Sequence, residues 1–146
     1  LGISEIEADL LIKKWYSTYC MVQPWKDMIV NTCLKYGFVR SLGGRKRRIE
    51  MDAGRLKWAR KVGATTSEMR EAVNFVIQGS SADITKLAIA RLEEADIRLQ
   101  VHDELVIEQS DNMAIDKVKQ IMENVYKLAV PLTVDIVECK NWGAAK

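Results

Sequence analysis

The chain has 146 residues, of which 48% are hydrophobic and 29% are charged, and its net charge is +2. A chain of this length and balance buries one ordinary core, as a globular protein does. No apolar run approaches the ~18 residues of a membrane span, and three cysteines without Cys-x-x-Cys spacing beside a single histidine exclude a Cys/His zinc site. We therefore expect reduced thiols, an intracellular location and no membrane partner.

Charge is unevenly distributed along the chain. Residues 40–61 include nine basic and two acidic residues, a local balance of +7, whereas residues 93–139 include eleven acidic and four basic residues, a balance of −7. A basic and an acidic segment in one small protein suit a phosphate chain together with metal ions. The alternative is that the two segments are solvent-exposed surfaces of opposite charge without a ligand.

Two helices are predicted at the start of the chain. Ser4 and Glu7 have the spacing of a capping box ahead of an apolar-periodic run. Pro24 suits the first turn of a second helix, and Gly37 suits its end. The expected helices cover residues 4–20 and 25–36.

A basic hairpin follows in the stretch FVRSLGGRKRRIE, residues 38–50. Its turn at Gly43 and Gly44 would join two short strands, of which the returning one is strongly basic. Residues 50–64 are charged and contain two glycines, so we expect a loop there with one helical turn.

The longest predicted helix begins at Thr65, which has capping-box spacing to Glu68, and ends near residue 94. Three small residues predict a weak or bent centre: Gly79, Ser80 and Ser81. A polar stripe repeats at i, i+4 and i+8 opposite an apolar side, although any surface helix has a polar face. Amide side chains in such a stripe can donate to minor-groove acceptors that all base pairs share. The stripe residues are Arg70, Asn74 and Gln78.

The stretch LQVHDELVIE, residues 99–108, reads as two strand arms with His102, Asp103 and Glu104 at the tip. A hairpin built only for stability would place Asn-Gly or Asp-Gly there, because those residues accept positive φ. Two adjacent carboxylates repel each other unless a divalent ion neutralises them, and their hard oxygen ligands suit Mg²⁺ or Mn²⁺. The hairpin tip is therefore a candidate metal site, and a solvated acidic turn is the alternative.

The last predicted elements are a helix and a strand. Asp111 or Asn112 caps the helix, which continues to about Leu128, and Pro131 blocks its extension. Alternating apolar residues predict the strand: Leu132, Val134 and Ile136. Because the strands lie far apart in the sequence, the order of elements indicates an α+β fold with an antiparallel sheet covered by helices.

Four segments together resemble family A DNA polymerases. QVHDELVIE (residues 100–108) is similar to motif C of that family, and NFVIQGSSADITK (74–86) to its Asn-x-x-x-Gln-Gly-Thr-Ala-Ala-Asp-Ile-x-Lys helix. YGFVRSLGGRKRRI (36–49) resembles its Gly-Tyr-Val-x-Thr-x-x-Gly-Arg-Arg-Arg segment, and VPLTVDIVECKNW (130–142) its closing Val-Pro-Leu-x-Val segment. The four occur in the family's order over nearly the whole chain.

The resemblance implies a role for each candidate site residue. Asp103 would be a catalytic ligand of the divalent ions, and Glu104 a weaker or outer-shell partner. Gln100 and His102 would lie near the primer terminus, the polar stripe would contact the duplex in the minor groove, and basic residues of the hairpin would hold template phosphate. The implied DNA-binding residues are Arg45, Arg47, Arg48, Arg70, Asn74, Gln78, Gln100 and His102.

The resemblance also implies an organisation. Residues 1–66 would be the C-terminal part of the fingers with the basic hairpin, and residues 67–146 the palm portion with the motif C hairpin and the C-terminal strand. Motif A (Asp-Tyr-Ser-x-x-Glu-x-Arg) and the nucleotide-binding fingers helix are absent from the sequence. Since the family performs template-directed nucleotidyl transfer by a two-metal mechanism, we expect this chain to be part of a larger or split enzyme and to be inactive alone.

The implied partners are primer-template DNA, the missing N-terminal polymerase portion and, in the complete enzyme, a dNTP. The compartment would be the cytoplasm or another that contains DNA. An unpaired sheet edge beside the motif C hairpin would favour homo-oligomers of the isolated chain. A non-catalytic duplex-DNA-binding domain is the alternative function, and a metal-dependent nuclease would need more carboxylates at compatible spacing than the sequence contains.

Overall fold

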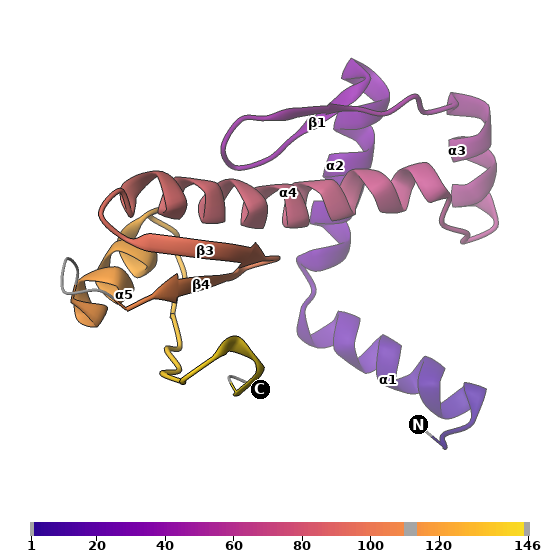
Figure 1. Cartoon of the computed structure of the whole chain (residues 1–146). Helices are drawn as coiled ribbons and strands as arrows, with labels where there is room; N and C mark the ends of the chain where they lie inside the picture. Colours follow the sequence, from indigo (N-terminus) through magenta and orange to yellow (C-terminus); the bar gives the residue numbers. More distant parts are fainter. Residues whose placement is uncertain (1, 110–113, 145–146) are drawn as a thin grey trace. The chain divides into compact units, whose positions relative to one another are not determined.

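Helices and two short β hairpins alternate along the chain in a computed structural model, which describes residues 2–109 and 114–144 (Figure 1). The elements are α1 (Glu5–Thr18), α2 (Val22–Tyr36), β1 (Phe38–Arg40), β2 (Lys46–Arg48), α3 (Ala53–Lys61), α4 (Ser67–Arg91), β3 (Asp96–Val101), β4 (Glu104–Glu108), α5 (Ile115–Asn124) and the 3-10 helix η1 (Trp142–Ala144). The expected α+β class is confirmed. The chain forms two compact units, residues 1–77 and 78–146.

The helix ends in the first unit follow the predicted capping chemistry. Ser4 Oγ accepts from the Glu7 N–H at 3.3 Å, and the Ser4 N–H donates to Glu7 Oε2 at 2.8 Å, so the capping box is complete. These hydrogen bonds from Ser4, first from its backbone and then from its hydroxyl, lower the pKa of the Glu7 carboxyl. Pro24 lies in the first turn of α2, and Gly37 ends that helix at φ 71° in the left-handed region.

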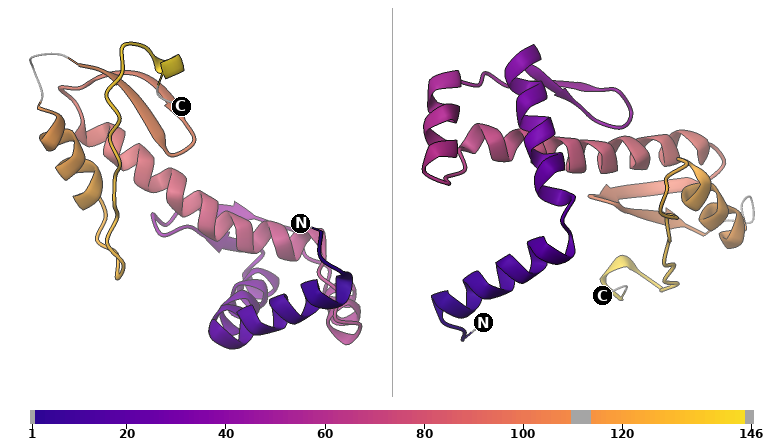
Figure 2. Two further views of the ribbon diagram at one scale, coloured as in Figure 1. Left: turned by 90° about the horizontal axis from the view of Figure 1, so that it is seen from below. Right: turned by 180° about the vertical axis from the view of Figure 1, so that it is seen from behind.

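The core of the first unit joins α2, the β1–β2 hairpin, α3 and the N-terminal part of α4, and Figure 2 shows the hairpin lying along α4 beside α2. Its buried residues are Ile29, Val30, Cys33, Val39, Ile49, Leu56, Ala72 and Val73. Cys33 is fully buried, and desolvation raises the pKa of its thiol. By contrast, α1 has no buried residue, and its isoleucine and leucine side chains are exposed.

The segment expected to be a loop with one helical turn contains the nine-residue helix α3 instead. The Asp52 side chain accepts from the Arg55 N–H and caps the helix. Leu56 and Ala59, three residues apart, are its buried residues, and Leu56 belongs to the core of this unit. Burial of that face stabilises a helix whose other positions are charged or exposed, which local composition does not reveal.

The long helix α4 begins at Ser67, two residues after the predicted start. Thr66, rather than Thr65, supplies the capping oxygen, because its Oγ1 accepts from the Met69 N–H at 3.3 Å. The helix is continuous to Arg91 and includes Gly79, Ser80 and Ser81, where the sequence predicted a weak or bent centre.

In the second unit, β3 and β4 pair antiparallel, with Val101 opposite Glu104 and an irregularity between Ile97 and Leu99. Two-stranded sheets β1–β2 and β3–β4 are the pairings found in the described part of the chain. The buried residues of this unit include Ala88, Leu92 and Val125.

The C-terminal predictions need correction. Helix α5 ends at Asn124, before Leu128, and the predicted cap at Asp111 or Asn112 lies outside the described residues. The expected strand around residues 132–136 is not a strand within the described range 114–144. A strand needs a partner backbone, whereas the Val134 N–H donates to the Glu123 carboxylate at 3.0 Å.

The described helices include none that is both long enough and apolar enough to cross a bilayer.

Candidate nucleic-acid and metal site

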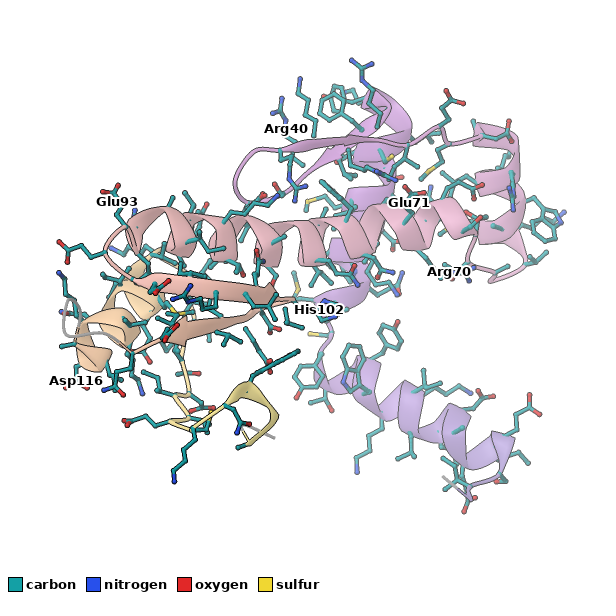
Figure 3. All side chains as sticks on the ribbon, viewed as in Figure 1. Arg40, Arg70, Glu71, Glu93, His102 and Asp116 are labelled. Atoms are coloured by element: carbon teal, nitrogen blue, oxygen red, sulfur yellow. The ribbon has the colours of Figure 1, made fainter. Side chains whose placement is uncertain are left out.

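The tip of the β3–β4 hairpin is a two-residue turn formed by His102 and Asp103 (Figure 3). His102 has φ 55°, and it is the one non-glycine residue with positive φ among the described residues. Left-handed backbone costs a residue with a Cβ roughly 1–2 kcal/mol. The turn therefore keeps a histidine where glycine or asparagine would be more stable, and such local strain is typical of functional sites.

Gln100 stabilises this turn. Its Nε2 donates to the His102 carbonyl oxygen at 3.1 Å, two residues along the chain. The sequence resemblance assigned Gln100 to the primer terminus, but this positioning contact was not predicted. The spacing of two residues across a turn was the available signal, because side-chain amides often close turns in this way.

The two carboxylates of the tip are both exposed, Asp103 in the turn and Glu104 as the first residue of β4. Hard carboxylate oxygens suit Mg²⁺ or Mn²⁺, which take about six oxygen ligands. Across residues 2–109 and 114–144, no three or more His, Cys, Asp or Glu side chains gather closely enough to hold a metal ion. The donor chemistry of the pair fits a divalent ion, and two carboxylates alone would leave most of its ligand positions to other groups.

The three predicted arginines of the basic hairpin differ in their surroundings. The Arg45 guanidinium lies 5.4 Å from the centre of the Phe75 ring on α4. Arg47 forms a two-point ion pair with Glu71 Oε1, from Nη2 at 2.8 Å and from Nε at 3.1 Å. Arg48, opposite Phe38 in the hairpin register, is exposed. The charge of Arg47 is thus partly balanced within the protein, which sequence spacing could not reveal.

The polar stripe lies on successive turns of α4, as predicted. Arg70, Asn74 and Gln78 are all exposed, whereas Ala72 and Val73 are buried. Arg70 also donates to the Thr65 carbonyl at 3.4 Å. Figure 3 shows Glu71 on the side of α4 that faces the β1–β2 hairpin and Arg70 on a different side. The stripe is therefore a continuous row of hydrogen-bond donors on one helix.

Sequence comparison decides the family. The model of DNA polymerase family A matches residues 1–144. The chain belongs to DNA polymerase family A. It is 36% identical to DNA polymerase I, thermostable, of Thermus aquaticus and 34% identical to that of Thermus filiformis, in each case over all of this chain and 18% of the relative.

A further relative and a solved structure agree with this. DNA polymerase I of Deinococcus radiodurans is 35% identical over the whole chain and 16% of its own length. The POL domain of Pol1 from M. smegmatis, in complex with DNA primer-template and dNTP, superposes with a TM-score of 0.77 at 29% identity, over 98% of this chain and 26% of that one. The chain thus spans under a fifth of the polymerases it resembles in sequence, and the family resemblance read from the four segments is confirmed.

Proposed function

We propose that this family A polymerase chain supplies the motif C turn and part of the duplex grip of a DNA-directed DNA polymerase. The observation that carries the proposal is His102, held at φ 55° between Gln100 and the two carboxylates. A turn selected for stability alone would relieve that strain with glycine or asparagine. The strained turn keeps histidine and two acids at the segment that resembles motif C, which supports a role in catalysis.

In this proposal, Asp103 is the main ligand of a catalytic Mg²⁺ or Mn²⁺ and Glu104 a weaker or outer partner. When bound, the ions of a two-metal site activate the primer 3′ hydroxyl and stabilise the leaving pyrophosphate. The two carboxylates present a local charge of −2 on an exposed turn, which attracts hard cations. Further ligands would come from outside the described residues, as expected for a chain that spans a fraction of its relatives.

The DNA contacts divide by chemistry. Asn74 and Gln78 would donate to minor-groove acceptors common to all base pairs, so the grip would not depend on sequence. Arg70 would contact the minor groove beside them, and Gln100 and His102 would lie near the primer terminus. The hairpin arginines would hold template phosphate: Arg45, Arg47 and Arg48.

The proposed organisation assigns residues 1–66 to the fingers and residues 67–146 to the palm. The partners would be primer-template DNA, dNTP and the N-terminal polymerase portion, in an intracellular compartment that contains DNA. The chain alone would be inactive. Duplex binding without turnover is the second candidate, because the exposed polar stripe and the hairpin arginines could hold a duplex without a metal ion. Each two-stranded sheet also leaves strand edges unpaired in the described chain, which favours homo-oligomers.

A chimera tests the proposal. This chain would replace the matching segment of the Thermus aquaticus relative, and primer extension would be measured with Mg²⁺ and dNTPs. We expect extension by the chimera and a loss of at least about a hundredfold in Asp103→Asn, because a metal ligand contributes several kcal/mol to transition-state stabilisation. Asp116→Asn, an exposed acid on α5, is the matched control.

Undiminished extension by Asp103→Asn would contradict the metal assignment. A chimera that binds primer-template but never extends it would favour the second candidate.

A further inference from the structure

A groove in the first unit has none of the residues proposed above for the duplex or the metal in its lining. It has a volume of about 440 Å³ and is formed by α2, β1 and one residue of α4. Buried Ile29 and Val39 are among its lining residues, and its exposed edge includes Met28 and Tyr36. We call it the aromatic groove and define it by Trp25, Met28, Tyr36, Phe38, Arg40 and Val76.

Three cations lie over the two neighbouring rings Tyr36 and Phe38, and Arg40 is the cation that also lines the groove. The Phe38 ring has the Lys46 ammonium at 4.8 Å and the Arg40 guanidinium at 5.2 Å from its centre. The Tyr36 ring has the Lys35 ammonium at 5.0 Å. The two ring centres are 6.2 Å apart with planes tilted by 40°. None of the described residues that line the groove is acidic.

This combination suits single-stranded nucleic acid. Unpaired bases stack on aromatic side chains, and lysine and arginine beside the rings attract the phosphates that link the bases. A duplex hides the faces of its bases, so it cannot use the rings in this way. An exposed cation–π contact is weaker than base stacking, so a base can take the place of a flexible lysine side chain over a ring.

The charges argue against an apolar occupant. An apolar peptide seated in the groove would remove water from Arg40 and from the cations beside it and offer them no counter-charge, which is unfavourable. A phosphate chain neutralises the same cations while its bases fill the apolar space. Residues 40–61 have a net positive charge, so the attraction for phosphate continues along the hairpin.

We propose that the aromatic groove binds an unpaired nucleobase of single-stranded nucleic acid, with Lys35, Arg40 and Lys46 holding the adjoining phosphates. This contact is independent of Asp103 and of the polar stripe of α4. In a polymerase it would hold unpaired template, and it requires no catalysis by this chain.

The test is binding of a fluorescein-labelled oligothymidylate of about 12 nucleotides to the full chain, measured by fluorescence anisotropy at low salt. We expect Tyr36→Leu, a substitution at an exposed position, to weaken binding at least about fivefold, since stacking is lost while apolar bulk is kept. Lys35→Ala should flatten the plot of log affinity against log salt by about 0.7, the slope for one phosphate contact on a single strand.

Matched controls separate this site from general surface effects. Trp58→Leu removes another exposed ring of the first unit, on α3, and Lys13→Ala removes a cation of α1. Both should bind oligothymidylate like the unaltered chain, and Tyr36→Leu should bind a blunt-ended DNA duplex as the unaltered chain does.

Equal oligothymidylate affinity of Tyr36→Leu and the unaltered chain would overturn the proposal. So would a dimer, seen by sedimentation, that Tyr36→Leu dissociates, because a second copy would then occupy the groove. As a second measurement, photocrosslinking with 5-iodouracil in the oligonucleotide should label Tyr36 or Phe38, and labelling confined to other residues would also overturn it. The primer-extension result for Asp103→Asn leaves each of these outcomes unchanged.

Discussion

The conformation of His102 allows the strain of the motif C turn to be measured directly. At φ 55° a residue with a Cβ carries roughly 1–2 kcal/mol of unfavourable energy, which glycine does not. His102→Gly removes this strain but adds about 0.5–1 kcal/mol of unfolded-chain entropy. We therefore expect a net stabilisation of the β3–β4 hairpin of about 0.5–1 kcal/mol.

The assay is hydrogen exchange at the backbone amides of β3 and β4, which reports local stability without assuming that the two units unfold together. The expected gain corresponds to exchange about two to five times slower at protected amides of the hairpin. His102→Ala is the control, because alanine keeps the Cβ and hence the strain. It should not slow exchange.

Equal exchange rates in the glycine and alanine variants would refute the reasoning, since the backbone conformation would then not be strained. In the chimera, His102→Gly should also reduce primer extension despite the more stable hairpin, because the proposed primer-terminus contact is lost. A more stable turn with full activity would show that the histidine has no role in the reaction.

Two further predictions concern the first unit. Glu71→Gln releases Arg47 from its ion pair, so the affinity for duplex DNA should rise, and the plot of log affinity against log salt, measured by anisotropy, should steepen by about 0.9. Glu5→Gln removes the same charge from α1 and should leave this slope unchanged. The folded-state pKa of Glu7 is lowered, so the capping box stabilises α1 above the unfolded pKa of Glu7, and this stabilisation is lost as pH falls through the folded pKa, as carboxyl NMR shifts of Glu7 should show. Ser4→Ala keeps the backbone donor and removes the hydroxyl, so it should move the titration part of the way back toward the ordinary value, and an unmoved titration would contradict the contribution of the hydroxyl.

Local chemistry explains why several elements could be predicted. The Ser4–Glu7 box and the left-handed Gly37 involve residues within one turn of each other, so their spacing alone predicts a helix start and a helix end. The two hairpins follow likewise from short turns, at the glycines before Arg45 and at His102 between apolar arms. The family, too, was readable from four segments in order along the chain.

Other features depended on residues far apart. Helix α3 exists because Leu56 and Ala59 find a buried surface, although their neighbours are charged. The predicted final strand failed because no partner backbone meets it among the described residues, and Val134 donates to Glu123 instead. In both cases burial or pairing outweighed the local pattern.

The sequence by itself determined the family, the Ser4–Glu7 capping box, the helix end at Gly37 and the acidic hairpin turn, because these rest on short-range spacing and on residue chemistry. Only the tertiary structure decided that Arg47 meets Glu71, 24 residues away, and that Tyr36 and Phe38 line one groove beneath three cations. The physical reason is that charge neutralisation and ring exposure depend on which surfaces fold against each other, and spacing along the chain does not encode that.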